Sequence, residues 1–163
     1  MSTPPSEKVE VNLGRSQWTG TRPIPSEHKH VGYVLNSDNR EVKISPEFTI
    51  NDQDRVTRIQ HDYVIRRNWS PRPTFTTLHP VEDESDLVEI SYLDPTSRSG
   101  ILTVEDISRF QASVFWFLGY IVEETETEFK LAISSFEFSD GLKEYEYPHI
   151  IPKGSILSIT YFR

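Results

Sequence analysis

The feature that most constrains the fold of this chain is the alternation of apolar and polar side chains in its second half. Residues 87–93 alternate around Glu89 and Ser91, and residues 114–122 form a longer apolar segment that contains Gly119. Three further segments of the same kind follow, at residues 129–138, 145–151 and 156–162. A period of two residues is typical of strands, and a glycine inside a long strand lets a sheet bend. The pattern predicts a mainly β fold with a small curled five-stranded antiparallel sheet or barrel.

Turn and helix signals separate these segments. Asp140-Gly141 marks one turn, and Pro152-Lys153-Gly154 forces a tight connection before the last strand, which gives Pro152 and Gly154 structural roles beside Gly119. One short helix is expected near residue 103, because Thr103 can cap it and Glu105 and Asp106 then occupy its first turn.

The first 80 residues carry weaker signals. Residues 1–29 mix Pro, Gly, Ser and charge, which favours a flexible N-terminal arm. The alternation of Val9, Val11 and Leu13 leaves open a short strand that adds to the sheet edge of a partner. Residues 30–80 predict an N-terminal hairpin followed by a Pro-rich extended segment, since each proline pushes the residue before it towards extended geometry.

Charge and proline content both change near residue 80. Eight of the 11 prolines precede it, and residues 1–80 carry a net charge of +2 against −10 for residues 81–163, which together give the −8 of the chain. We therefore expect residues 81–163 to form an acidic β domain. A surface so poor in Lys and Arg disfavours non-specific nucleic-acid binding by that domain.

Several chemistries lack their sequence signature. The chain has no cysteine, which excludes disulfides and thiolate catalysis. It contains no G-x-S-x-G motif and no glycine-rich phosphate loop, so we expect a protein that is not an enzyme and needs no cofactor. No apolar stretch approaches the roughly 20 residues of a membrane span, and no signal peptide is evident, so we expect a cytoplasmic protein without a membrane partner.

The order of elements in the second half resembles that of the Sm-like small β-barrel: a short helix, five strands, a glycine-bent second strand and a tight turn before the last strand. Gly119 matches the glycine of the family's first motif, and Lys153-Gly154 matches the basic-Gly pair of its second motif. The resemblance implies ring assembly and RNA binding on two loops. The Glu/Thr run at residues 123–128 replaces the Asp and Asn of the family pattern. Residues 117–159 are also similar to short uncharacterised phage and prokaryotic proteins.

The most distinctive polar segment interleaves arginines with aromatic residues. Arg66, Arg67, Trp69 and Arg72 can neutralise phosphates and stack on bases, and Lys153 is a further binding candidate. The same arginines can instead dock this segment onto the acidic domain, and this interpretation is favoured.

Two clusters carry side chains of the kinds that bind metal ions. The carboxylates of residues 123–128 could hold a hard cation, but a solvated turn explains them better, because unsupported carboxylates repel one another. Glu27, His28, His30 and the His61-Asp62 pair could contribute to a zinc site, but exposed polar residues are the favoured reading and no metal site is predicted.

These observations favour a non-enzymatic binding or assembly protein whose partners are copies of itself or another protein, and the similarity to phage proteins raises a phage origin. Self-association is expected because residues 114–118 are apolar on both faces of their strand. An RNA-binding Sm-like ring protein is the alternative, and an acidic viral inhibitor of a host enzyme is a further one.

Overall fold

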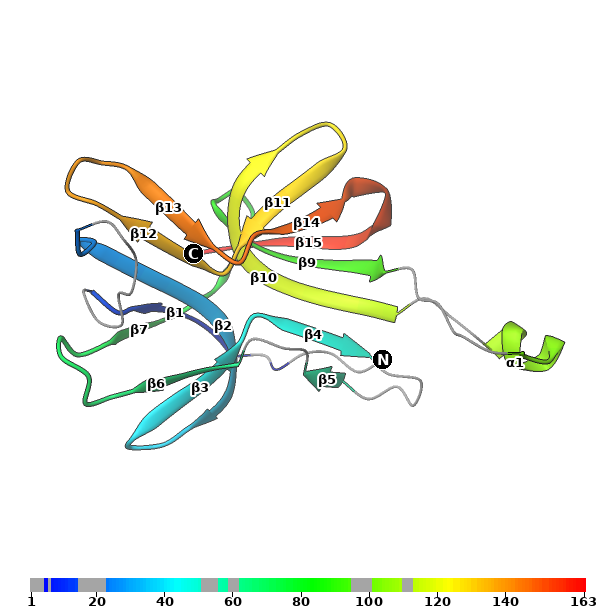
Figure 1. Ribbon diagram of the computed structural model, residues 1–163, viewed down its shortest axis with the longest axis horizontal. Coiled ribbons are helices and arrows are strands. Elements are labelled where there is room, and N and C mark those ends of the chain that lie inside the picture. The colour runs from blue at the N-terminus through cyan, green and yellow to red at the C-terminus, as the bar shows by residue number, and fades with distance from the viewer. Residues whose placement is uncertain are drawn as a thin grey trace.

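The computed structural model describes residues 5, 7–14, 23–50, 56–58, 62–94, 101–109 and 113–163. Within this part of the chain the fold is mainly β, with two antiparallel sheets, one short α-helix and one 3₁₀ turn (Figure 1). The prediction of a mainly β protein is therefore confirmed. The prediction of one five-stranded sheet is wrong, because the described strands form a seven-stranded and an eight-stranded sheet.

The first sheet has the order β13-β12-β2-β1-β7, with β3 paired to β2 and β6 paired to β3. Its strands are β1 (Lys8–Asn12), β2 (Glu27–Ser37), β3 (Glu41–Ser45), β6 (Tyr63–Arg66), β7 (Thr74–Thr77), β12 (Ser134–Glu137) and β13 (Lys143–Glu146).

The second sheet has the order β14-β11-β10-β9-β15-β8, with β4 paired to β10 and β5 paired to β4. Its strands are β4 (Glu47–Ile50), β5 (Val56–Arg58), β8 (Pro80–Val81), β9 (Leu87–Asp94), β10 (Ser113–Glu124), β11 (Glu128–Ala132), β14 (His149–Pro152) and β15 (Ile156–Phe162). The 3₁₀ turn η1 (Lys153–Ser155) connects β14 to β15, as expected from its tight connection.

At two of the places where the chain passes from one sheet to the other, a single residue separates the two strands. Pro46 separates β3 from β4, and Ile133 separates β11 from β12. The single strand expected over residues 129–138 is thus divided at Ile133, and its two parts pair with different neighbours. A strand that bends in this way can form the corner between two packed sheets.

Residues 1–29 are not a flexible arm over their described part. β1 lies between β2 and β7, and the side chains of Val9, Val11 and Leu13 are buried. Their alternation does indicate a strand, as the alternative interpretation held, but this strand pairs within its own chain. Burial of these apolar side chains in the sheet centre outweighs the polar composition around them.

The described strands also show no division between residues 30–80 and residues 81–163. β4 pairs with β10, and β12 pairs with β2, so each sheet combines strands from both segments. The boundary expected at residue 80 followed composition, whereas the strand pairing is decided by complementary apolar faces.

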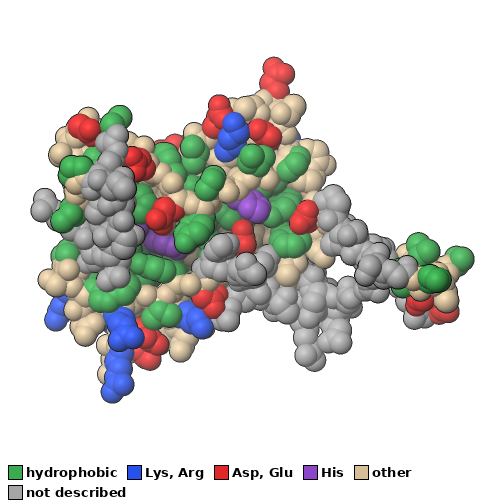
Figure 2. All heavy atoms as spheres, viewed as in Figure 1, with side chains coloured by type: hydrophobic (Ala, Val, Ile, Leu, Met, Phe, Trp, Pro, Cys, Tyr) green, Lys and Arg blue, Asp and Glu red, His purple; other side chains and the backbone are tan. Residues whose placement is uncertain are grey.

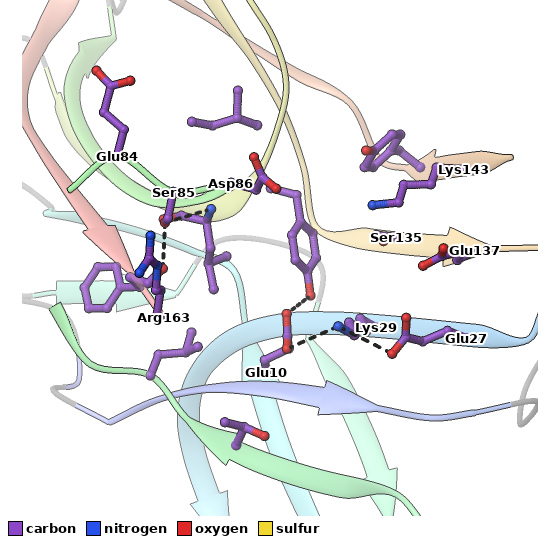
Figure 3. A pocket seen from close by; sticks show the side chains of 17 residues that line it. Glu10, Glu27, Lys29, Glu84, Ser85, Asp86, Ser135, Glu137, Lys143 and Arg163 are labelled. Carbon is purple, nitrogen blue, oxygen red and sulfur yellow. Dashed lines mark hydrogen bonds and ion pairs between the residues drawn. The ribbon is translucent and has the colours of Figure 1, made fainter. Parts of the chain in front are cut away.

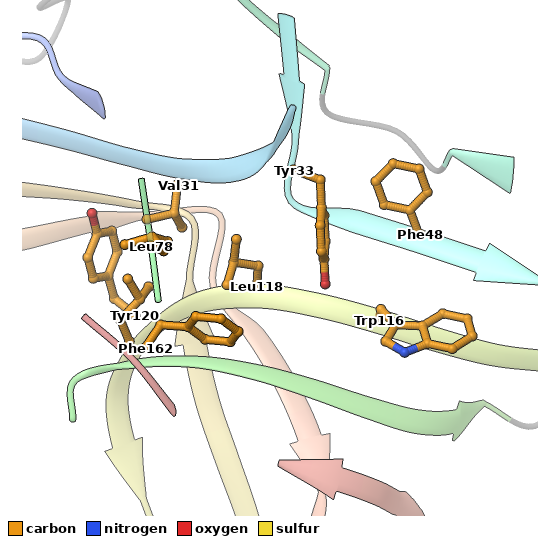
Figure 4. Packing of buried hydrophobic residues seen from close by; sticks show 9 residues of the cluster. Val31, Tyr33, Phe48, Leu78, Trp116, Leu118, Tyr120 and Phe162 are labelled. Carbon is orange, nitrogen blue, oxygen red and sulfur yellow. The ribbon is translucent and has the colours of Figure 1, made fainter. Parts of the chain in front are cut away.

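The core explains why β10 is apolar on both faces. Trp116, Leu118 and Tyr120 point to one side, where they pack with Val31 and Phe48 in a cluster completed by Tyr33, Leu78, Leu87 and Phe162 (Figure 4). Phe117 points to the other side, into a cluster with Val88, Ile90, Tyr92, Phe129, Leu131, Ile133 and Ile151. The N-terminal strands β2 and β4 therefore cover one of the two apolar faces of β10, and the self-association expected from these faces stays a prediction.

The short helix α1 (Val104–Arg109) follows the predicted cap. The Asp106 amide donates a 3.1 Å hydrogen bond to Thr103 Oγ1, and the Thr103 amide donates a 3.2 Å bond to Asp106 Oδ2. This reciprocal pair is a capping box. No helix in the described part of the chain has the length and apolar content needed to traverse a lipid bilayer.

Candidate functional site

A cluster of arginines forms where the β2–β3 turn meets the segment after β6. β3 and β6 pair with Glu41 opposite Arg66, and the Arg67 amide donates a 2.8 Å hydrogen bond to the Arg40 carbonyl. These contacts bring Arg40, Arg66, Arg67 and Arg72 around one surface depression of about 740 Å³. Asp38, Asn39, Glu41 and Asn68 complete its lining. We call these four arginines the arginine cluster.

Asp38 holds the β2–β3 turn of this cluster in place. Its Oδ1 accepts hydrogen bonds of 2.7 Å from the Arg40 amide and 2.9 Å from the Glu41 amide. These two bonds, with smaller help from the charges of Arg40 and Arg67, lower the pKa of the Asp38 carboxyl below its usual value. The carboxylate therefore stays ionised and keeps the turn ordered.

Arg67 is the fixed member of the arginine cluster. Its Nε donates a 2.7 Å hydrogen bond to the Asp38 carbonyl and its Nη2 donates a 2.9 Å bond to Ser37 Oγ. Its guanidinium carbon lies 5.1 Å from the centre of the Phe75 ring, in cation–π geometry. All of these contacts lie within the first sheet, so the docking of Arg67 onto the acidic residues 81–163 is not observed.

The other three arginines project into solvent. Arg40, Arg66 and Arg72 are exposed. In the space-filling view, Lys and Arg side chains gather at the lower left, over the ends of β2, β3 and β6 (Figure 2). The lining of the depression carries four positive charges against the two negative charges of Asp38 and Glu41.

Trp69 does not extend this surface as an open stacking platform. It is half-buried, packs against the cluster that contains Val11, Val42 and Ile65, and lies 6.3 Å from Tyr63 at a ring angle of 59°. The described contacts of Trp69 therefore show a side chain that packs against the core of the first sheet.

Lys153 lies apart from the arginine cluster, at the end of β14 in the second sheet. Its Nζ is 2.8 Å from Glu124 Oε1 and 5.1 Å from the centre of the Phe129 ring. Lys130 pairs in the same way with Glu123. The acidic run at residues 123–128 is thus partly neutralised by neighbouring lysines at an exposed hairpin end.

The expected structural residues differ in what they require of the backbone. A Cβ on Gly119 would lie 2.6 Å from Phe117 Cε1 and 2.8 Å from the Ala132 carbonyl oxygen, so only glycine fits there. A Cβ on Gly154 would meet no atom within 4 Å. Pro152 precedes η1 in extended geometry, with φ −62°.

His28 and His30 are buried, so their expected exposure is wrong. The His28 ring stacks on Phe136 at 4.1 Å, and the His30 ring stacks on Tyr63 at 4.6 Å. Burial, with the nearby His28, lowers the pKa of His30 to about 4. No group of three or more metal-binding side chains occurs among the described residues, and His61 lies outside them.

His149 gains partners that its sequence neighbours did not indicate. Its Nε2 lies 2.8 Å from Tyr92 Oη, its Nδ1 lies 3.6 Å from Glu47 Oε1, and its ring stacks on Phe117 at 4.7 Å. Burial, with the charges of Glu47 and Asp94, raises the pKa of Tyr92. The Tyr92 phenol therefore stays protonated at neutral pH.

A second depression of about 550 Å³ lies between the sheets (Figure 3). Tyr120 Oη donates a 2.7 Å hydrogen bond to Glu10 Oε2 at its wall. Lys29 Nζ lies 3.9 Å from Glu10 and 3.4 Å from Glu27, which links three charges in a chain. Burial and the charge of Glu10 raise the pKa of Tyr120. Sequence reasoning missed this site, since its residues come from strands far apart in the chain.

Comparisons with known proteins add no family. No protein-family model matches the chain, and neither the characterised proteins nor the solved structures contain a significant match.

Proposed function

We propose that this protein is a non-enzymatic binding protein that takes up the phosphates of a single-stranded nucleic acid on the arginine cluster. The observation that carries the proposal is the convergence of four arginines on one depression in a chain whose net charge is −8. Positive charge gathered on one small surface of an acidic protein defines where a polyanion can approach.

The chemistry of the cluster suits phosphate. Guanidinium groups present several N–H donors in a plane and pair with phosphate oxygens through two hydrogen bonds at once. Arg67 is held by Ser37, the Asp38 carbonyl and Phe75, so little side-chain entropy remains to be lost when a ligand binds. Arg40, Arg66 and Arg72 are free to reach successive phosphates.

A single strand is the better ligand for two reasons. The depression is compact, because its arginines come from one turn and one short segment. A ligand bound there therefore contacts it with only a few nucleotides. The planar guanidinium groups also offer surfaces on which unpaired bases stack, as aromatic rings do in other single-strand sites.

The Sm-like resemblance remains part of this proposal. Its support is the order of the second half: β9 pairs with β10 and β15, β10 pairs with β11, β11 pairs with β14, and η1 precedes β15. The ligand surface proposed here lies in the first half, where the arginines are.

Assembly with further copies is a second candidate function. Among the described strands, β7 pairs with β1 alone, and its residues Thr74, Thr76 and Thr77 are exposed and uncharged. An open, uncharged edge is a common route to strand addition. Light scattering on the intact protein separates the two candidates, because this one requires a mass above 18.9 kDa without any nucleic acid.

Fluorescence anisotropy with a labelled short uridine-rich RNA tests the main proposal. We expect Arg66→Ala and Arg72→Ala each to weaken binding about tenfold, as removal of a charged hydrogen bond does. Lys143→Ala is the matched control, because it removes one exposed positive charge from β13 and should leave affinity unchanged. Each arginine substitution should also reduce the slope of log affinity against log salt by about 0.7. Equal losses for all three variants, or no binding by the unmodified protein, would refute the proposal.

A further inference from the structure

The strand pairing of the first half recurs in the second half. β1 pairs with β2 and β7 as β9 pairs with β10 and β15. β3 pairs with β2 and β6 as β11 pairs with β10 and β14, and β5 pairs with β4 as β13 pairs with β12. We call residues 8–77 unit 1 and residues 87–162 unit 2. Each unit thus contributes seven strands in the same chain order.

The register of the strands recurs as well. Val9 faces Gly32 in unit 1, and Val88 faces Gly119 in unit 2. The β2–β3 ladder shifts register between Val34 and Asn36, and the β10–β11 ladder shifts between the matching residues Ile121 and Glu123. A bulge at the same point of two ladders is a feature of the fold rather than a chance irregularity.

The two units exchange strands with each other. β4 of unit 1 pairs with β10 of unit 2, with Glu47 opposite Phe117, and β12 of unit 2 pairs with β2 of unit 1, with Ser134 opposite His30. The bends that precede these strands make matching bonds, 2.9 Å from the Leu118 amide to the Pro46 carbonyl and 3.1 Å from the Val31 amide to the Ile133 carbonyl. Reciprocal contacts of this kind are typical of twofold symmetry.

Matching positions also carry matching side chains. Val31-Gly32-Tyr33-Val34 corresponds to Leu118-Gly119-Tyr120-Ile121, and Glu41-Val42-Lys43-Ile44 corresponds to Glu128-Phe129-Lys130-Leu131. The His30–Tyr63 stack at 4.6 Å recurs as the Phe117–His149 stack at 4.7 Å. A Cβ on Gly32 would lie 2.8 Å from Ile44 Cβ, so a larger residue does not fit at this position, as it does not at Gly119.

We propose that the chain is an internal duplication, in which two equivalent units form a strand-exchanged pair within one polypeptide, and that only unit 1 carries an anion site. The partner that each unit fits is the other unit, since β4 and β12 complete the sheet of the opposite unit. The second part of the proposal rests on the function proposed above.

The loops that form the arginine cluster have counterparts in unit 2. Lys153 corresponds to Arg67, because its amide donates a 2.8 Å bond to the Thr127 carbonyl as the Arg67 amide does to Arg40. Lys153 contacts Glu124 where Arg67 contacts Ser37. Pro152 faces Glu128 where Arg66 faces Glu41. The counterpart loops therefore hold no arginine, and the carboxylates of Glu123, Glu124, Glu126 and Glu128 surround them.

A hairpin graft in the full chain tests the duplication. Residues 121–128 are replaced by the sequence of residues 34–41, Val-Leu-Asn-Ser-Asp-Asn-Arg-Glu. If the units are equivalent, the graft keeps the bulge and turn in register, and we expect a cooperative thermal melt within about 5 °C of the unmodified protein. The composition-matched control carries the same eight residues in reversed order and should lose the folded state. A graft that melts as low as this control would overturn the duplication.

The same variant tests the divergence of the two sites. We expect the unmodified chain to bind one equivalent of a short uridine-rich RNA by calorimetric titration, and the graft combined with Pro152→Arg to bind two. A folded graft that still binds one equivalent would overturn the assignment of the anion site to the unit 1 loops. No binding by the unmodified chain would refute the function proposed above, while the melts still decide the duplication.

Discussion

Tyr120 in β10 donates a 2.7 Å hydrogen bond to Glu10 in β1, and so joins the longest strand of unit 2 to the first strand of unit 1. The matching residue of unit 1, Tyr33, donates a 2.5 Å bond to Glu89 in β9. Both phenols are buried, and each carboxylate also lies near a lysine, Lys29 for Glu10 and Lys8 for Glu89. Each unit therefore satisfies a buried hydroxyl of the other, which couples their folding.

Removal of either phenol hydroxyl should weaken this coupling. We expect Tyr120→Phe and Tyr33→Phe each to lower the free energy of unfolding by about 1–3 kcal/mol, because each leaves a carboxylate without a charge-assisted hydrogen bond. Urea unfolding followed by circular dichroism measures the change. Tyr145→Phe on β13, an exposed tyrosine, is the control and should be neutral. Equal stability of all three variants would contradict the role given to these bonds.

Two glycines of the second half should respond differently to substitution. Gly119→Ala places a Cβ against Phe117 and the Ala132 carbonyl, so we expect it to lower the free energy of unfolding by about 1–3 kcal/mol. Gly154→Ala meets open space and should be tolerated. Thermal melts of the two variants check this contrast. If the Gly119→Ala protein has the same melting temperature as the unmodified protein, β10 has room for a Cβ at this position.

Stability should fall as the pH is lowered through the range set by His30. Burial keeps its folded pKa at about 4, below the ordinary 6.5, so the unfolded state binds the proton first. The stabilisation is therefore complete above pH 6.5 and declines towards pH 4, by about 3 kcal/mol from this residue. Tyr63 stacks on the His30 ring, and the charge of His28 adds to the effect of burial, while the hydrogen bond to the Val31 carbonyl opposes it.

His30→Phe provides the test of that pH dependence. Phenylalanine already occupies the matching position of unit 2, Phe117, where it stacks on His149. We expect the variant to unfold with a shallower dependence on pH between 6.5 and about 4 than the unmodified protein. Urea unfolding at a series of pH values measures this, and parallel curves for the two proteins would assign the acid sensitivity to other groups.

The first strand should prove essential although its surroundings are polar in sequence. Val11 is fully buried between β2 and β7, so Val11→Ala should lower the free energy of unfolding by about 2 kcal/mol. Val64→Ala, at an exposed position on β6, removes the same atoms and should have little effect. Chemical denaturation of both variants checks the prediction, which fails if the two changes cost the same.

The local structure of this chain could be predicted from the sequence wherever it depends on residues that are neighbours in the chain. Alternation predicted residues 87–93 and 114–122, and the structure has strands at Leu87–Asp94 and Ser113–Glu124. The cap at Thr103 and the tight connection at residues 152–154 were equally local. Arg66, Arg67 and Arg72 were identified for the same reason, since they lie close together in sequence, whereas Arg40 was missed because it joins them only through the pairing of β3 with β6.

Strand partners were beyond such reasoning. Alternation shows that a segment has one buried face, but it does not say what covers that face. β1 was taken for an arm because its composition is polar, and residues 129–138 were taken for one strand because nothing local marks the bend at Ile133. The Gly-Tyr pair of residues 32–33 recurs at residues 119–120, with an apolar residue on each side of both pairs. This similarity was a sequence signal for two equivalent units, although the composition of the two halves differs.

The sequence by itself determined the strands at residues 87–93 and 114–122, the capped helix and the tight connection at residues 152–154, because backbone propensity and side-chain alternation act over a few residues. Only the tertiary structure decided which strands pair. It also made two matching strand contacts different, the one between β4 and β10 and the one between β12 and β2. Phe48 opposes Trp116 in a filled core, whereas the matching Ser135 opposes Lys29 at the open depression between the sheets. Which of these faces closes depends on side-chain volumes contributed by strands far apart in the chain, and such volumes meet only after the fold has formed.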